Sequence, residues 1–245
     1  MGKKKIIISF AGTNYHGWQV QNNALTVQEV LQNAVEKMFS KRLDITGCSR
    51  TDAGVHANNF CCHFDTNANI SNIGIVKGLN TLLPNDICVK SCEDVADDFH
   101  ARYSATKKQY VYKIHNSSIR NPFLDNLALR YDRDLKLDDI NEFCKNIIGT
   151  YDFYGFSSSG RTVTDTVRTI YDCNFTKDGD ICLFTVTGNG FLYNMVRILV
   201  GTALYVSEGK IDPKATKDII LSKDRSLAGP TVSPCGLYLN QVYYE

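Results

Sequence analysis

The chain has 245 residues, of which 43% are hydrophobic and 22% charged, and its formal net charge is +1. This balance is typical of a folded globular protein and excludes an intrinsically disordered chain. No apolar run is long enough to span a bilayer, and the first residues lack the apolar stretch and cleavage site of a secretory signal. We therefore expect a cytoplasmic protein.

Nine cysteines are present, but their arrangement favours neither disulfide bonds nor a zinc site. Their number is odd, Cys61 and Cys62 are adjacent, and no pair of CxxC motifs occurs. Small buried thiols in a reducing compartment explain this pattern better, so we expect no metal site.

The first hundred residues alternate between strands and helices. Alternating hydrophobicity predicts strands at 4–10, 60–65 and 87–90. A helix is predicted to begin at Thr26, because Glu29 completes a capping box and apolar residues recur at helical spacing up to Met38. A second helix is predicted at 70–82 and stops before Pro84.

The second part of the chain contains a clear hairpin signal. Strands are predicted at 109–115, 167–175, 181–187 and 237–244, and Asp178-Gly179 joins the middle two as an antiparallel pair. Helices are predicted at 137–148, where Gly149 would cap the C-terminus, and at 191–206. Asp212 should cap a further helix that has Pro213 in its first turn.

This order of elements favours an α+β fold over a parallel doubly wound fold, because the hairpin requires antiparallel pairing. We expect two lobes, each a mixed and mainly antiparallel sheet with helices packed on it. The boundary is placed near 104–106, which gives an N-terminal lobe at 1–104 and a C-terminal lobe at 105–245.

Asp52 is the single carboxylate in the small, polar segment from Cys48 to Ala57. Two interpretations are open. Asp52 and Gly54 could form an ordinary turn in which the carboxylate bonds its own backbone. Alternatively, the segment is a catalytic loop that presents Asp52 from a rigid sheet.

Arg197 is the only charged residue in the apolar segment 191–201. Its guanidinium must therefore reach solvent or meet an anion. If Arg197 is buried, a pairing with Asp52 would keep that carboxylate ionised, as a nucleophile requires.

Two aromatic segments also leave alternatives open. Aromatic and basic residues alternate between Phe99 and Tyr110, as they do on surfaces that stack bases and hold phosphates, but an ordinary strand with Tyr110 in the core fits equally well. Tyr15, His16 and Trp18 form a cluster that fits packing as well as binding.

The small net charge counts against a polyanionic partner unless the basic residues gather on one face. The residues that could form such a face are Lys3 to Lys5, Arg102, Lys107, Lys108, Arg161, Arg168 and Arg197.

Taken together, these segments resemble the TruA family of tRNA pseudouridine synthases over nearly the whole chain. The matching segments are 15–19 with Gln21, 50–57, 99–102 with Ser104, Ala105 and Tyr110, 194–197 with Gly201, and 236–239. Their order along the chain is that of the family.

The resemblance implies the pseudouridine synthase fold, with an RNA-binding cleft between two similar lobes, and a homodimer. It also implies that uridines at positions 38–40 of the tRNA anticodon stem-loop are isomerised to pseudouridine. Because this rearrangement involves neither a redox change nor transfer of a group to another molecule, no cofactor and no metal are expected.

The resemblance further implies roles for five residues. Asp52 would be the nucleophile, with Arg197 holding it ionised. Tyr110 would stack on the uracil and could move a proton, and Leu237 would form an apolar wall. Because a base inside a stem must be flipped out, we expect the planar guanidinium of Arg50 to occupy the vacated stack.

Two other functions remain open. The chain could pseudouridylate a different RNA, because target choice lies in surface loops. It could also be a non-catalytic RNA-binding protein on the same scaffold, although such a protein would be expected to have lost Asp52 or Tyr110, and both are present.

Overall fold

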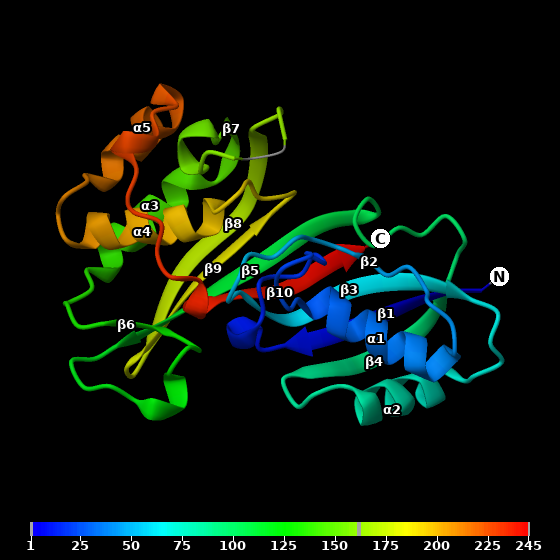
Figure 1. Ribbon diagram of the computed structural model, residues 1–245. Helices are drawn as coiled ribbons and strands as arrows, with labels where there is room; N and C mark the ends of the chain where they lie inside the picture. Colours follow the sequence, from blue (N-terminus) through cyan, green and yellow to red (C-terminus); the bar gives the residue numbers. More distant parts are fainter. Residues whose placement is uncertain (1, 161–162, 245) are drawn as a thin grey trace. The chain divides into compact units, whose positions relative to one another are not determined.

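The structure, a computed structural model, describes residues 2–160 and 163–244 (Figure 1). The chain folds into two compact units, one formed by Met1–Thr106 with Tyr238–Glu245 and the other by Lys107–Leu237. The last strand of the chain therefore belongs to the N-terminal unit. The boundary predicted from the sequence, near residue 104, had assigned this strand to the C-terminal lobe.

The first unit contains a sheet with the strand order β4-β1-β3-β10, and the short β2 pairs with β3. Its strands are β1 (Gly2–Phe10), β2 (Thr46–Gly47), β3 (His56–Thr66), β4 (Ile87–Val95) and β10 (Leu237–Tyr244). β1 runs antiparallel to both neighbours, so that Ile6 lies opposite Cys62 and Cys92. β10 runs parallel to β3, with Tyr238 opposite His56.

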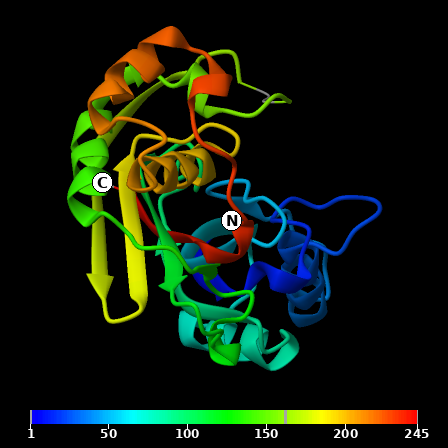
Figure 2. The same ribbon diagram turned by 90° about the vertical axis from the view of Figure 1, so that its left-hand side faces the viewer.

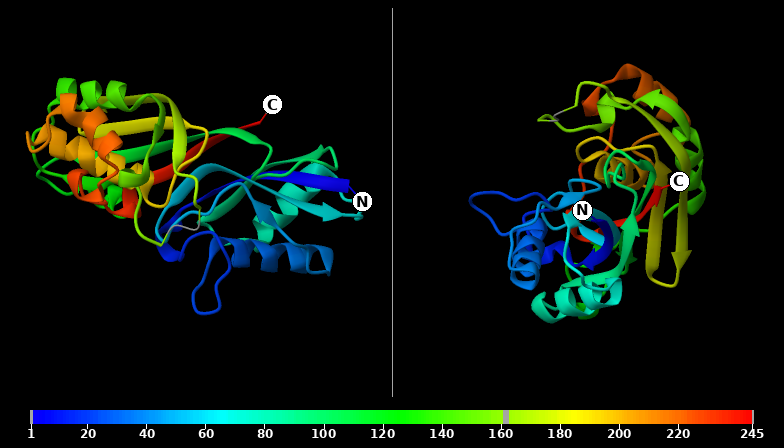
Figure 3. Two further views of the ribbon diagram at one scale, coloured as in Figure 1. Left: turned by 90° about the horizontal axis from the view of Figure 1, so that it is seen from above. Right: turned by 90° about the vertical axis from the view of Figure 1, so that its right-hand side faces the viewer.

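Helices α1 (Val27–Phe39) and α2 (Asn72–Leu82) pack on one face of this sheet, as Figure 3 shows. The side chains of β1 are buried alternately, as the period of two requires. Phe39 of α1 contacts Phe64 of β3 edge to face, with ring centroids 5.7 Å apart. The hydroxyl of Thr26 accepts a hydrogen bond from the Glu29 backbone N–H at 3.4 Å, which confirms the predicted helix start.

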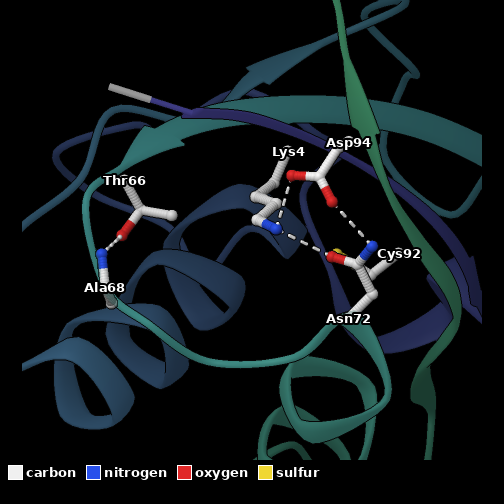
Figure 4. A network of polar contacts seen from close by, with 6 residues as sticks. All are labelled: Lys4, Thr66, Ala68, Asn72, Cys92 and Asp94. Atoms are coloured by element: carbon white, nitrogen blue, oxygen red, sulfur yellow. Dashed lines mark hydrogen bonds and ion pairs between the residues drawn. The ribbon is translucent and has the colours of Figure 1, made fainter.

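A buried lysine joins three elements of this unit (Figure 4). Nζ of Lys4 donates to Oδ1 of Asn72 at 2.9 Å and forms an ion pair with Asp94 at 2.6 Å, while Asn72 donates to the same carboxylate at 2.9 Å. Lys5 is paired with Glu93 at 2.6 Å. Two lysines of the predicted basic face thus meet carboxylates, and Arg161 of that face lies outside the described residues.

The second unit contains the strand order β5-β9-β8-β7, and β6 pairs with β5 in parallel. Its strands are β5 (Ala105–Asn116), β6 (Leu129–Tyr131), β7 (Gly149–Asp152), β8 (Val167–Asp178) and β9 (Ile181–Gly188), and its helices are α3 (Leu137–Ile147), α4 (Met195–Ser207) and α5 (Thr216–Ser222). β8 and β9 form the predicted antiparallel hairpin (Figure 2). Phe175 lies opposite Phe184 in its register. Both units are therefore α+β, with mixed and mainly antiparallel sheets, as expected.

Several predicted boundaries were wrong. α4 begins at Met195 rather than at 191, because Asn194 has a φ of 60° and a left-handed residue cannot continue a right-handed helix. α3 ends at Ile147, and Gly149, with a φ of 133°, opens β7 instead of capping the helix. β3 and β4 extend well beyond 60–65 and 87–90, because β1 pairs with them along its length. The short strands β2, β6 and β7 were not predicted.

All nine cysteines are free thiols, and six of them are buried, as expected. Within the two described ranges, no helix combines the length and the apolar character that a membrane span requires.

Candidate active site

Asp52 lies in the loop between β2 and β3, where it is half-buried between exposed Arg50 and a tight turn. The Val55 N–H donates to the Asp52 carbonyl oxygen at 3.2 Å, and Gly54 has a φ of 76°. The backbone therefore forms the turn that the sequence suggested, while the carboxylate stands at its start. A turn and a catalytic loop are compatible descriptions of this segment.

The N-terminal segment of the chain holds this loop through its backbone. Trp18 N–H donates to the carbonyl oxygen of Thr51 at 3.2 Å, and Gly54 N–H donates to that of Tyr15 at 3.2 Å. At the other end, Nδ1 of buried His56 accepts a hydrogen bond from the Gly12 N–H at 2.9 Å. The residues on both sides of Asp52 are thus tied to one neighbouring segment, which restricts where its carboxylate can point.

Two glycines allow this close approach. A Cβ at Gly12 would overlap with the carbonyl group of Val55, and a Cβ at Gly17 would overlap with the carbonyl oxygen of Thr51 and lie 3.2 Å from the Asp52 carbonyl carbon. Gly17 also has a φ of 84°, a conformation that side chains disfavour. Both positions require glycine because backbone contacts backbone there.

Tyr15 and Trp18 pack, whereas His16 is exposed. The Trp18 ring stacks on Phe60 of β3, with centroids 4.1 Å apart. The Tyr15 hydroxyl donates to Asp86 at 2.6 Å, and burial together with this carboxylate raises the pKa of the phenol. The two aromatic side chains of this motif therefore anchor it in the first unit, while its backbone forms the hydrogen bonds to the Asp52 loop.

In the second unit, Arg197 projects from the first turn of α4 and is half-buried. Its Nε donates to the carbonyl oxygen of Val232 at 2.7 Å, and one Nη donates to Oδ1 of Asn194 at 2.8 Å. Asn194 in turn donates to the hydroxyl of Ser158 at 3.0 Å. The guanidinium is planar, so two fixed nitrogens set the orientation of the whole group.

The segment that carries Val232 is pressed against α4. The Gly229 N–H donates to the hydroxyl of Thr202 at 2.9 Å, and a Cβ at Gly201 would overlap with the carbonyl group of Pro230. The hydroxyl of Tyr112 donates to the carbonyl oxygen of Ser233 at 2.6 Å. These contacts fix the backbone that holds Arg197 and that leads into β10.

Tyr110 and Leu237 are both buried. Tyr110 lies on β5, and the edge-to-face contact with Phe191 places the two ring centroids 5.1 Å apart. Leu237 is the last residue of the second unit and the first of β10.

The aromatic and basic segment from Phe99 onward divides into a packed and an exposed part. Nδ1 of His63 accepts a hydrogen bond from the Ala101 N–H at 3.1 Å, and Phe99 contacts Tyr244 with ring centroids 5.1 Å apart. Tyr103, in contrast, is 75% exposed and lies against His100. Part of this segment therefore packs in the first unit and part of it is exposed, and its contact with RNA stays a prediction.

The comparisons with known proteins decide the family. A family model described as tRNA pseudouridine synthase matches residues 6–104 and 143–245. The chain belongs to the tRNA pseudouridine synthase family. It is therefore an isomerase that acts on tRNA, as the sequence motifs indicated.

Individual members of the family are similar along their whole length. A tRNA pseudouridine synthase A of Thermoanaerobacter sp. (strain X514) is 45% identical over 239 residues, which is 98% of each chain. That of Ruminiclostridium cellulolyticum is 43% identical over 245 residues and covers 100% of both chains. A chain in the crystal structure of a Cbf5-Nop10-Gar1 complex is 10% identical in sequence and superposes with a TM-score of 0.40. The match covers 96% of this chain and 57% of the chain in the complex.

The structure of this pseudouridine synthase places the predicted site residues in two groups. Asp52 and Arg50 share one loop of the first unit, while Tyr110, Arg197 and Leu237 belong to the second unit. The pairing of Asp52 with Arg197 stays a prediction. Within residues 2–160 and 163–244, no three His, Cys, Asp or Glu side chains are arranged to hold a metal ion.

Sequence reasoning missed the contacts that orient Arg197. Val232 acts through its backbone carbonyl, which no side-chain pattern reveals. Asn194 offered a usable signal, because asparagine tolerates a positive φ better than most residues and stands directly before the helix.

Proposed function

We propose that this chain isomerises uridine to pseudouridine at positions 38–40 of the tRNA anticodon stem-loop, with Asp52 as the nucleophile. The observation that carries the proposal is the Asp52 loop itself, which is held on both sides by backbone hydrogen bonds from the segment 12–18. A reaction in which the base must turn within its site needs a nucleophile of fixed position.

The isomerisation breaks the bond between N1 of uracil and C1′ of the ribose, turns the base, and joins C5 to C1′. The hydrogen on C5 is lost as a proton, and N1 gains a proton, so the electrons balance without an oxidant or a reductant. Asp52 attacks either the base or the sugar to form the covalent intermediate. No cofactor enters any of these steps.

Arg197 keeps Asp52 ionised in this proposal, since a neighbouring guanidinium favours the charged form of a carboxylate. The hydrogen bonds to Val232 and Asn194 support this role, because they fix the guanidinium before substrate arrives. Tyr110 stacks on the uracil and moves a proton, and Leu237 lines the apolar wall of the pocket.

Arg50 occupies the stack that the flipped nucleotide leaves. Its exposure at the start of the loop, two residues before Asp52, supports this role. We also propose that the enzyme works in the cytoplasm as a homodimer. Light scattering coupled to size-exclusion chromatography tests the dimer, and a mass of 27.5 kDa at micromolar concentration would exclude it.

The test uses tRNA transcripts that carry tritium at C5 of uridine, because pseudouridine formation releases this hydrogen. The wild-type chain should release tritium without added cofactor or metal, and Asp52→Asn, which keeps the shape but removes the nucleophile, should not. Asp44→Asn is a matched control, because it removes an exposed carboxylate shortly before the same loop. Appreciable release by Asp52→Asn would contradict the mechanism.

The same assay separates the alternatives. Release from ribosomal RNA but not from tRNA transcripts would indicate a different RNA target. Binding of tRNA without release from any RNA would indicate a non-catalytic protein.

A further inference from the structure

The second unit contains a pocket of about 310 Å³ beside β6 that the proposed reaction does not use. It is lined by His115 of β5, by Arg130 of β6 and by residues of the loop 117–128. Figure 1 shows this loop between the two strands. Its volume is at the lower end of the range for small-molecule sites. The family model matches 6–104 and 143–245 and leaves these residues out, although full-length relatives align across them.

His115 forms the buried wall of the pocket. It is 6% exposed, and no other residue in the described ranges forms a hydrogen bond with its imidazole. Because His115 lines the pocket, its ring nitrogens can form hydrogen bonds with a ligand or with water. His115 lies opposite Arg130 in the parallel pairing of β5 and β6, so the two side chains are neighbours.

The other polar groups of the pocket are mainly hydrogen-bond donors. One Nη of Arg130 donates to the Ser118 carbonyl oxygen at 3.1 Å, which holds the guanidinium against the loop. Oδ1 of Asn121 accepts a hydrogen bond from the Phe123 N–H at 3.0 Å, which leaves its amide group as a donor. Arg120 is exposed and forms no hydrogen bond or ion pair with the described part of the chain.

One carboxylate lines the pocket. Asp125 accepts a hydrogen bond from the Asn126 amide at 3.2 Å. Because Arg120 and Arg130 also line the pocket, its positive charges outnumber this single negative charge. Leu124 and Ala128 provide an apolar wall. The same loop exposes two large apolar side chains, Phe123 at 85% and Ile119 at 75%.

We propose that this pocket binds a nucleotide through its phosphate group. Arg120, Arg130 and Asn121 donate hydrogen bonds to the phosphate oxygens, and His115 completes the inner side. The sugar lies against Leu124, and the exposed ring of Phe123 on the same loop suits an adjoining base. The phosphate belongs either to the backbone of the RNA substrate or to a free nucleotide, and the first of these sources rests on the proposed function.

Arg120→Gln is the variant of choice, because Arg120 makes no contact on which folding depends. Lys217→Gln is the matched control: it removes one exposed positive charge from α5 of the same unit. His115→Phe, which keeps the size of the ring but removes its nitrogens, tests the buried side. Two measurements are made on each protein, binding of radiolabelled uridine 5′-monophosphate by equilibrium dialysis and affinity for unmodified tRNA across a salt series.

If the phosphate belongs to RNA, Arg120→Gln weakens tRNA binding about five- to tenfold at low salt and reduces the slope of log affinity against log salt by about one. His115→Phe also weakens binding, and Lys217→Gln leaves the slope near that of the wild type. If the phosphate belongs to a free nucleotide, the same variants abolish mononucleotide binding and leave tRNA affinity unchanged.

The proposal is overturned if neither ligand distinguishes Arg120→Gln and His115→Phe from Lys217→Gln. This result is independent of the proposed reaction, because binding is measured without turnover. Conversely, a wild-type chain that released no tritium would refute the reaction and leave the binding measurements valid.

Discussion

Replacement of Gly17 by alanine tests whether the N-terminal segment positions the catalytic carboxylate. Gly17 lies outside the Asp52 loop, yet a Cβ there would overlap with the Thr51 carbonyl oxygen and crowd the backbone of Asp52 at 3.2 Å. Neither obstacle is a flexible side chain, so the loop or the segment 12–18 must move. We expect the loop to shift by about 1 Å, since backbone overlap of this kind cannot be relieved by a change of rotamer.

The expected effects follow from this shift. A positive φ costs a residue with a Cβ about 1–2 kcal/mol, and overpacking adds about 1–3 kcal/mol, so the free energy of unfolding should fall by about 2–5 kcal/mol. A misplacement of about 1 Å in a catalytic group reduces turnover by about 100-fold. Affinity for tRNA should change little, because the phosphate contacts that dominate RNA affinity are untouched.

Tritium release under single-turnover conditions measures the rate, and urea denaturation measures stability. Gly179→Ala is the matched control, because Gly179 has a φ of 55° at the β8–β9 turn and a Cβ there meets no described atom within 4 Å. It should lose about 1–2 kcal/mol of stability and retain full turnover. Our account of the loop is refuted if Gly17→Ala, when folded, turns over tRNA at the wild-type rate.

Two further predictions concern Asn194 and His63. Asn194→Gly keeps the positive φ but removes the hydrogen-bond acceptor that holds the Arg197 guanidinium. We therefore expect the single-turnover rate to fall about tenfold, with little change in the thermal midpoint of unfolding. An unchanged rate would exclude a positioning role for Asn194. Burial, and secondarily the charge of Lys3, lowers the pKa of His63 to about 4. The unfolded chain binds this proton more tightly, so the free energy of unfolding should fall by about 1–2 kcal/mol as the pH drops from 6.5 to 4. This fall is smaller than the whole shift of the pKa would give, because water screens part of the charge. Denaturation of His63→Gln across this range should show a smaller fall, and an identical fall would assign the effect to other groups.

The order of the elements could be predicted from local patterns. The helix start at Thr26 and the hairpin at Asp178-Gly179 depend on residues within a few positions of one another, and both were confirmed. Boundaries were less predictable where pairing decides them. β4 continues through the charged residues up to Val95 because Lys4 and Lys5 on β1 supply the partners for its carboxylates.

The sequence by itself indicated the family and predicted Asp52 as the nucleophile, because the motifs are runs of adjacent residues whose identity needs no structure. Only the tertiary structure explains why particular residues, such as the glycines, are required in those motifs. Gly12 and Gly17 allow two backbone segments to touch, and these contacts join positions that are 43 and 34 residues apart in the chain. The orientation of Arg197 likewise depends on a carbonyl group of Val232, 35 residues further on. Contacts of this kind are made by the backbone, which is the same for every residue, so side-chain patterns in the sequence cannot reveal them.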